Sequence, residues 1–282
     1  MKFIKIKSYA KVNLSLNILG KLTSKLHKIE SIVSFLDLHD EIYLKIIKSC
    51  DHQISFYGSF SKGISKKNTI SKLLYALDKK KLLNNQKFEI RIKKNIPQQS
   101  GMGGGSMNAS SIISFFLKKK IIKLKDRKLK NLSNSIGSDV ILGANKKNKV
   151  LFSNGKLKIF DKKLNFHVLV AKPNFGCSTK QIFSRVIEYS KPLYNKPNKS
   201  LLNRDIIINS SNDLEKIVFQ KYSKFRKLKS FLLKLPNSLF IRMTGSGSSI
   251  VVYFQSKKAA VRGSKLFKKK LKSYWCIVSK TI

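Results

Sequence analysis

The chain has 282 residues, 42% of them hydrophobic, and carries 59 Lys and Arg against 14 Asp and Glu, a net charge of +45. This composition is typical of a globular protein of one or two domains and excludes an intrinsically disordered chain. No apolar run approaches the roughly 18 residues of a membrane span, and the first residues do not resemble a signal peptide. We therefore expect a soluble, cytoplasmic protein with no membrane partner.

The positive charge has two explanations, and the sequence leaves both open. The basic residues are mostly Lys, lie along the whole chain and accompany many Ile, Asn, Phe and Tyr, all of which have AT-rich codons. Base bias in the genome explains such a composition, and so does a polyanionic partner. Because the cations are not gathered into one arm or stripe, we expect no specific nucleic-acid partner.

The three cysteines, Cys50, Cys177 and Cys276, are widely spaced and form no C-x-x-C pair. Their odd number and spacing predict neither a disulfide framework nor a zinc site.

Hydrophobic periodicity predicts alternating strands and helices in the first half of the chain. Asn68 and Thr69 are candidate caps for the first helix, and Pro97 ends the strand before a glycine-rich stretch. The predicted strands are 3–19, 31–47 and 87–96, and the predicted helices are 68–83, about 106–120 and the first part of 129–144.

The second half continues with mixed elements. Asn154-Gly155 is a strong signal for the turn of a hairpin. The predicted elements are a hairpin over 149–160, a buried strand over 165–174, a short helix over 178–189, a loop over 191–200, helices over 212–222 and 225–235, a strand–turn–strand over 238–256, a basic helix over 257–274 and a strand over 275–281. This order predicts an α+β fold with two lobes, 1–155 and 156–282.

The segment 95–111, NIPQQSGMGGGSMNASS, places a glycine-rich turn between a predicted strand and a predicted helix. Glycines at positive φ and a helix N-terminus together form a nest of backbone N–H groups that binds anions, phosphate above all. The segment matches neither the Walker A pattern nor G-x-G-x-x-G. A flexible turn without a ligand is the alternative explanation.

Three motifs in order resemble the signatures of the GHMP kinase superfamily: SYAKVNLSLNILGK at 8–21, IPQQSGMGGGSMNAS at 96–110 and MTGSGSSIVVYF at 243–254. NTI at 68–70 and NDLE at 212–215 also resemble it. Within the superfamily, the motifs are most similar to the branch that phosphorylates 4-diphosphocytidyl-2-C-methyl-D-erythritol in the non-mevalonate isoprenoid pathway. The resemblance implies a ribosomal-protein-like N-terminal lobe and a ferredoxin-like C-terminal lobe.

The resemblance also implies the roles of individual residues. Asp139, in SIGSDVIL, matches the catalytic aspartate that takes the proton of the substrate's 2-hydroxyl, and Lys11 matches its paired lysine. The positions matching ATP-binding residues are Asn68, Pro97, Ser100, Gly101, Gly103, Gly104, Gly105 and Ser106. The positions matching substrate-binding residues are Asn13, His27, Phe183, Gly245 and Gly247. ATP and Mg²⁺ are the implied cofactors; Mg²⁺ bridges ATP phosphates largely through water, and no residue is assigned as a metal ligand.

The sequence departs from the family pattern at several places. The stretch 20–27 reads GKLTSKLH, with Leu26 where the family has an aromatic ring, and Met107 replaces a serine. Gln98 and Gln99 stand where the family is richer in glycine, and Ser110 where alanine is usual. These changes weaken the inferred substrate pocket more than the phosphoryl-transfer groups.

Several alternatives stay open. Homoserine and mevalonate kinases of the same superfamily are one, a basic nucleic-acid-binding protein is another, and a kinase with decayed activity is a third. The expected partner is a small cytidine diphosphate substrate, and the expected oligomeric state is a monomer or a homodimer.

Overall fold

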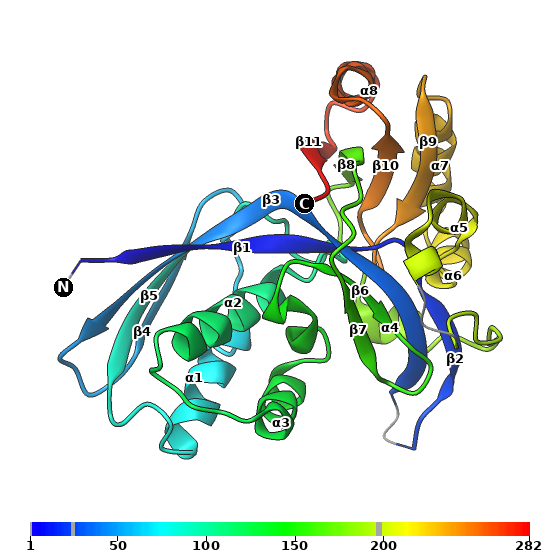
Figure 1. The fold of residues 1–282 in the computed structure, drawn as a ribbon. Helices are drawn as coiled ribbons and strands as arrows, with labels where there is room; N and C mark the ends of the chain where they lie inside the picture. Colours follow the sequence, from blue (N-terminus) through cyan, green and yellow to red (C-terminus); the bar gives the residue numbers. More distant parts are fainter. Residues whose placement is uncertain (1, 24–25, 196–198) are drawn as a thin grey trace. The chain divides into compact units, whose positions relative to one another are not determined.

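The computed structural model describes residues 2–23, 26–195 and 199–282 (Figure 1). In chain order the elements are β1 (Ile4–Asn13), β2 (Asn17–Lys21), β3 (His27–Ile47), β4 (Gln53–Tyr57), α1 (Thr69–Lys79), β5 (Lys87–Lys93), α2 (Gly104–Lys118), α3 (Asp126–Ile136), η1 (Val140–Ala144), β6 (Asn148–Leu151), β7 (Leu157–Phe160), β8 (His167–Lys172), α4 (Thr179–Phe183), η2 (Lys199–Leu202), α5 (Arg204–Asn209), α6 (Leu214–Lys221), α7 (Ser223–Leu233), β9 (Ser238–Met243), β10 (Ile250–Phe254), α8 (Lys257–Lys270) and β11 (Trp275–Lys280).

The chain forms two compact units that interleave along the sequence. Unit 1 comprises Met1–Lys11, Leu38–Gln98 and Gly103–Lys146, and unit 2 comprises Val12–Asp37, Gln99–Met102 and Lys147–Ile282. Mixed strands and helices in two units confirm the predicted α+β fold. Each unit consists of three segments of the chain and not of one continuous half. The division into lobes 1–155 and 156–282 therefore stays a prediction.

Unit 1 packs helices against a sheet. The second half of β3 pairs antiparallel with β5, and β4 pairs parallel with β5. In α1 the apolar residues fall at helical spacing, so Ile70, Leu73, Leu74 and Leu77 share one buried face. They join residues of β3, β5, α2 and α3 in one core. In Figure 1 α1, α2 and α3 lie together beside these strands.

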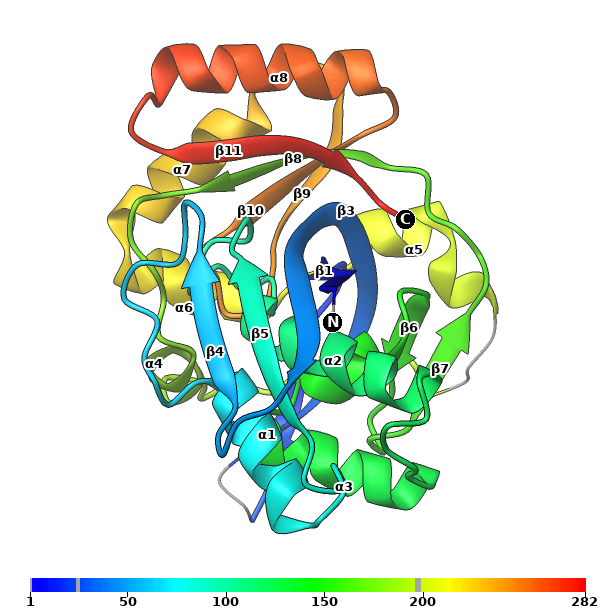
Figure 2. The ribbon, with the colours of Figure 1, turned by 90° about the vertical axis from the view of Figure 1, so that its left-hand side faces the viewer.

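Unit 2 contains a four-stranded antiparallel sheet in the order β11-β8-β10-β9. Figure 2 shows α8 lying along this sheet. Ala260 and Phe267 of α8 are buried against it, whereas the basic residues of the helix are exposed. Phe231 of α7 contacts Phe267 with 6.2 Å between ring centroids, so α7 and α8 cover the same core.

Most predicted elements are confirmed, apart from shifts of a few residues at their ends and three larger differences. The helix predicted over 178–189 ends at Phe183, because the residues after it, except the half-buried Val186, are exposed and offer no apolar face to pack. β4 and α5 were not predicted. Both are short, and β4 alternates exposed with half-buried residues, which gives a weak periodic signal. Residues 24–25 of the GKLTSKLH stretch and 196–198 of the predicted loop lie outside the described residues.

His52, which directly precedes β4, forms hydrogen bonds with β5 and α1. The backbone N–H of Phe88 donates to its Nδ1 at 3.0 Å, so Nε2 carries the proton and donates to Asp78 Oδ2 at 3.1 Å. Burial lowers the pKa of His52 below its ordinary 6.5, despite the nearby Asp78 carboxylate. A proton added at Nδ1 would remove the acceptor used by Phe88.

We therefore expect the free energy of unfolding to fall as pH drops below 6.5. The unfolded state then binds more protons at His52 than the folded state does. Urea unfolding midpoints measured from neutral pH downward should fall less steeply for His52→Gln, which keeps an acceptor but does not titrate in this range. Equal slopes for the two proteins would contradict this expectation.

Candidate active site

Lys11 and Asp139 form an ion pair in unit 1. Lys11 Nζ lies 3.2 Å from Asp139 Oδ2, and the Lys11 side chain is 4% exposed against 35% for Asp139. Asp139 precedes η1 but makes no capping hydrogen bond with its side chain. A helix-capping role therefore does not explain this carboxylate, which combines a buried cationic partner with access to solvent.

The glycine segment of unit 1 begins beside this pair. Gly103 caps α2 with φ of +66°, and a Cβ on it would lie 3.1 Å from Lys11 Cγ and 3.7 Å from Asp139 Oδ2. This left-handed position next to a packed side chain requires glycine. Gly104 and Gly105 then open α2, whose N-terminus has no side-chain cap, and such a helix end favours anions.

Thr69 fixes the first turn of α2 to α1. Its Oγ1 donates to the carbonyl of Gly105 at 2.9 Å, and a Cβ on Gly105 would lie 3.1 Å from the same hydroxyl. Ser106 follows in this turn and is half-buried. The predicted ATP-binding residues Gly103, Gly104, Gly105 and Ser106 therefore lie together at one helix end.

In unit 2, two motifs almost 150 residues apart are joined by hydrogen bonds. The N–H of Ser248 donates to Gln99 O at 3.1 Å, that of Ser249 to Ser100 O at 3.2 Å, and Thr244 Oγ1 to Gly101 O at 3.2 Å. A Cβ on Gly101 would lie 2.0 Å from Thr244 O. Only glycine fits here, so the start of the glycine stretch is shaped by the turn between β9 and β10.

Gly245 and Gly247 build that turn with φ of +54° and +85°. A Cβ on Gly245 would lie 2.9 Å from Gly101 O, and one on Gly247 3.2 Å from Cys177 Sγ. Both glycines are thus required by close packing within the protein, whatever ligand the turn binds.

Asn13 connects β1 to the same turn. Its Oδ1 accepts from the N–H of Gly245 at 3.0 Å, and its Nδ2 donates to Ser31 Oγ at 2.8 Å. Its own N–H donates to Thr244 Oγ1 at 3.1 Å, and the residue is 3% exposed. These contacts hold the turn in place, a role that sequence reasoning did not assign to Asn13.

Asn68 is the N-cap of α1, as its position in the sequence predicts. Its Oδ1 accepts from the N–H groups of Ile70 and Ser71 at 2.9 and 3.1 Å, and its Nδ2 donates to Ser65 O at 2.9 Å. Both the oxygen and the nitrogen of the Asn68 amide make local hydrogen bonds, so its ATP-binding role stays a prediction.

Two other predicted ATP-binding residues are buried: Pro97, in unit 1, and Ser100, in unit 2. Ser100 is 2% exposed, and its Oγ accepts from the N–H of Met102 at 3.4 Å. The Ser100 hydroxyl is therefore used within its own segment, and its ATP-binding role stays a prediction.

His27 and Phe183 meet in unit 2 although they are 156 positions apart in sequence. Their ring centroids are 5.2 Å apart at 43°. Burial, with a contribution from the charge of Lys21, lowers the pKa of His27 below its ordinary 6.5, which keeps the imidazole neutral at physiological pH. Phe183 ends α4, and Thr179 of that helix hydrogen-bonds to Ser246 of the glycine turn at 2.9 Å.

The departures from the family pattern have different structural consequences. Leu26 is 60% exposed, so its side chain is accessible but contributes no ring. Met107 and Ser110 are buried in α2 and pack against the backbone of Gly143. Gln98 Nε2 donates to the carbonyls of Phe60 and Lys62 at 2.9 and 2.8 Å.

Gln99 adopts a left-handed φ of +48°, a conformation usually taken by glycine. Gln99 therefore has a strained backbone at a position where the family is richer in glycine.

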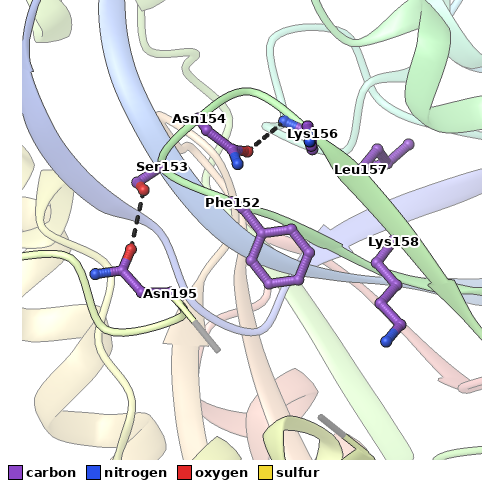
Figure 3. Close-up of a pocket in the computed structure, with 7 residues that line it drawn as sticks. All are labelled: Phe152, Ser153, Asn154, Lys156, Leu157, Lys158 and Asn195. Atoms are coloured by element: carbon purple, nitrogen blue, oxygen red, sulfur yellow. Dashed lines mark hydrogen bonds between the residues drawn. The ribbon is translucent and has the colours of Figure 1, made fainter. Parts of the chain in front are cut away.

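A cavity of about 330 Å³ in unit 2 contains none of these residues (Figure 3). It lies at the loop of the β6–β7 hairpin, where Ser153 Oγ donates to Asn195 Oδ1 at 3.0 Å. Its lining residues are Phe152, Ser153, Asn154, Lys156, Leu157, Lys158 and Asn195. The motifs, and not this cavity, mark the candidate active site.

Within residues 2–23, 26–195 and 199–282, no group of three or more His, Cys, Asp or Glu is placed to bind a metal ion. No helix in these ranges has both the length and the apolar character needed to cross a membrane.

Comparisons with known proteins agree with these motifs. The family described as "GHMP kinases N terminal domain" matches residues 68–147. The chain is 56% identical over 282 residues to a 4-diphosphocytidyl-2-C-methyl-D-erythritol kinase of Pelagibacter ubique (strain HTCC1062), covering 100% of both proteins. It is 30% identical to the kinase of that name from Caldanaerobacter subterraneus subsp. tengcongensis over 273 residues, covering 92% of this chain and 91% of the relative.

Among solved structures, the chain resembles the crystal structure of a 4-(cytidine 5'-diphospho)-2C-methyl-D-erythritol kinase with a TM-score of 0.77. The match covers 98% of this chain and 99% of that one at 18% identity. At this identity the likeness demonstrates a shared fold.

Proposed function

The chain belongs to the 4-diphosphocytidyl-2-C-methyl-D-erythritol kinase family, and we propose that it transfers the γ-phosphoryl group of ATP to the 2-hydroxyl of that cytidine diphosphate substrate. The observation that carries this proposal is the Lys11–Asp139 ion pair beside the left-handed Gly103. It combines a carboxylate, a buried cation and a helix N-terminus, which are the groups that phosphoryl transfer requires.

Asp139 is the proposed general base. Its carboxylate takes the proton of the 2-hydroxyl while that oxygen forms a bond to the γ-phosphorus, and the bond from phosphorus to ADP breaks. Lys11, held 3.2 Å from the carboxylate, orients it and provides positive charge near the transferring group.

The proposed phosphate-binding groups are the N–H groups at the start of α2, from Gly103 to Ser106. The helix end favours negative charge, and the absence of side chains on Gly103, Gly104 and Gly105 lets phosphate oxygens approach the backbone. Gly101 and the turn at Gly245 and Gly247 are proposed to shape the adjoining backbone in unit 2.

Magnesium fits this arrangement as an ion held chiefly by the phosphates of ATP. The described chain offers no cluster of three metal-binding side chains, and Asp139 is the carboxylate beside the glycine segment, suited to a contact through water. When bound, the ion neutralises negative charge on the phosphates.

The proposed cytosine-binding residues are His27 and Phe183. A neutral imidazole offers a hydrogen-bond donor and an acceptor to the base, and the phenyl ring offers a stacking surface. Leu26, exposed next to His27, provides apolar contact where the family has a ring. We also propose that the sequence divides into lobes 1–155 and 156–282. The protein is proposed to be cytoplasmic and to be a monomer or a homodimer.

The direct test is ADP release from ATP and Mg²⁺ with 4-diphosphocytidyl-2-C-methyl-D-erythritol, homoserine or mevalonate as the second substrate. We expect turnover with the first compound only, and ³¹P NMR should place the new phosphate on the 2-hydroxyl. Turnover with homoserine or mevalonate alone, or with none of the three, would overturn the proposal.

Replacing Phe183 by leucine is expected to raise the KM for the cytidine substrate about tenfold, the loss of one stacking contact. Leucine keeps apolar contact with the core of unit 2, against which Phe183 is packed. Steady-state kinetics should show an unchanged KM for ATP. Tyr189→Ala removes an aromatic ring that is 48% exposed elsewhere in unit 2 and serves as the control; equal effects of the two changes would exclude specific stacking.

A further inference from the structure

We propose that Asp40 is a positioning residue for the nucleotide: it fixes the segment Lys94–Pro97 and, through it, the first turn of α2. This inference rests on the proposed function, because it assigns the nucleotide phosphates to that turn. No motif points to Asp40, which lies in β3 more than 50 residues before the glycines.

The carboxylate of Asp40 is fully buried and accepts three hydrogen bonds from consecutive residues. Its Oδ1 accepts from the N–H groups of Asn95 and Ile96 at 2.7 and 2.8 Å, and its Oδ2 accepts from Lys94 Nζ. The Asp40 side chain thus binds two backbone N–H groups and the lysine ammonium group of the segment that leads from β5 to the glycines.

Further contacts leave this segment little freedom. The N–H of Lys94 donates to Tyr57 O at 2.7 Å, and Asn95 Nδ2 donates to His39 O at 3.0 Å. The segment lies outside helices and strands, so these hydrogen bonds replace the regular pairing that ends at Lys93.

The segment in turn contacts the start of α2. A Cβ on Gly104 would lie 3.2 Å from Ile96 Cγ2 and 3.3 Å from Lys94 Nζ. A shift of Lys94 or Ile96 would therefore displace Gly104, the first residue of the helix, where the proposed phosphate-binding N–H groups begin.

Charge makes Asp40 necessary at this place. Lys94 is a buried cation next to the positive end of a helix dipole, which is an unfavourable combination without a nearby anion. Asp40, in strand β3, supplies that anion.

The Lys94–Asp40 pair is more buried than the other described ion pairs of unit 1. Other ion pairs of unit 1 keep one partner accessible, as in Lys5–Glu41 with side chains 46% and 18% exposed, whereas the corresponding values for Lys94–Asp40 are 5% and 0%. Well-packed apolar residues often stabilise a fold as much as a buried pair does, so a specific position of the segment is the better explanation.

The test compares Asp40→Asn, Lys94→Met and the double variant by steady-state kinetics. Asparagine keeps an acceptor for Asn95 and Ile96 but leaves Lys94 without its anion. We expect Asp40→Asn to raise the KM for ATP about tenfold, the usual effect of losing a hydrogen bond to a charged group. The KM for the cytidine substrate should stay within about twofold, and adding Lys94→Met should restore part of the ATP affinity by removing the buried charge.

A matched control separates positioning from stability. Ile42→Val shortens a fully buried side chain of β3 two residues from Asp40 without touching the segment. It should lower the melting temperature and leave the KM for ATP unchanged. Should Asp40→Asn fail to fold, the neutral double variant carries the test: a wild-type KM for ATP in it would overturn the inference.

Nucleotide binding measured by calorimetry, with a non-hydrolysable ATP analogue and no second substrate, distinguishes this inference from the proposed function. If the wild type binds the analogue but phosphorylates no cytidine substrate, the proposed function fails while Asp40→Asn still tests the inference. Equal affinity of the folded Asp40→Asn variant and the wild type for the analogue would overturn the inference, whatever the activity.

Discussion

Replacing Asp139 by asparagine is expected to lower kcat about a thousandfold, within the range that a positioned general base contributes. Asparagine has nearly the same shape and can still contact Lys11, but it cannot take the hydroxyl proton. Because the glycine segment is untouched, the KM for ATP should stay within a few-fold of the wild type. Coupled ADP-release assays at saturating substrate would measure both parameters.

The control for Asp139→Asn is Asp161→Asn, which removes the same charge from a side chain that is 85% exposed and paired with Lys147. It should leave kcat unchanged. A fall of less than tenfold in kcat for Asp139→Asn, in protein with a normal melting temperature, would show that another group takes the proton.

Replacing Gly103 by alanine is expected to lower kcat/KM for ATP about a hundredfold, the cost of displacing bound groups by about 1 Å. Two effects combine at this position. The backbone has φ of +66°, which is strained for a residue with a Cβ, and the added methyl would lie 3.1 Å from Lys11 Cγ. The change therefore disturbs both the turn proposed to bind phosphate and the cation beside Asp139.

Gly63→Ala is the matched control for Gly103→Ala, since Gly63 also lies in unit 1 with φ of +80° but has open space where its Cβ would be. It reproduces the backbone strain without the contact. If both variants lose ATP affinity equally, strain and not the site explains the effect.

The sequence was sufficient to predict the elements that have a clear period or a cap. The α1 helix was predicted to begin at Asn68 and Thr69, and the asparagine caps it as expected. The helix predicted to begin near Ser106 begins at Gly104, because glycine N–H groups can start a helix that a propensity argument would start later. The pairing of Lys11 with Asp139 followed from resemblance alone, and the structure places the two side chains in contact.

The positioning residues could not be predicted, because their function lies in long-range contacts. Asp40 reads as an ordinary polar position in a strand, and its three hydrogen bonds all go to residues more than 50 positions away. Thr244 was visible within a motif, but its contacts with Asn13 and Gly101 could not be inferred from spacing. The sequence hints at it only through alternation, since Asp40 falls on the same strand face as Leu38 and Ile42.

The hydrogen bonds between the 99–101 stretch and the turn after β9 also determine how early during synthesis the 99–101 stretch can become ordered. Ser249 must be available before Ser100 can gain its partner, and 148 residues separate Gly101 from Ser249. At about 5 to 20 residues per second, the ribosome needs roughly 7 to 30 s to add them. A nascent chain that already contains Gly101 to Gly105 would therefore wait until β10 is made, so fragments ending before β10 should lack an ordered 99–101 stretch.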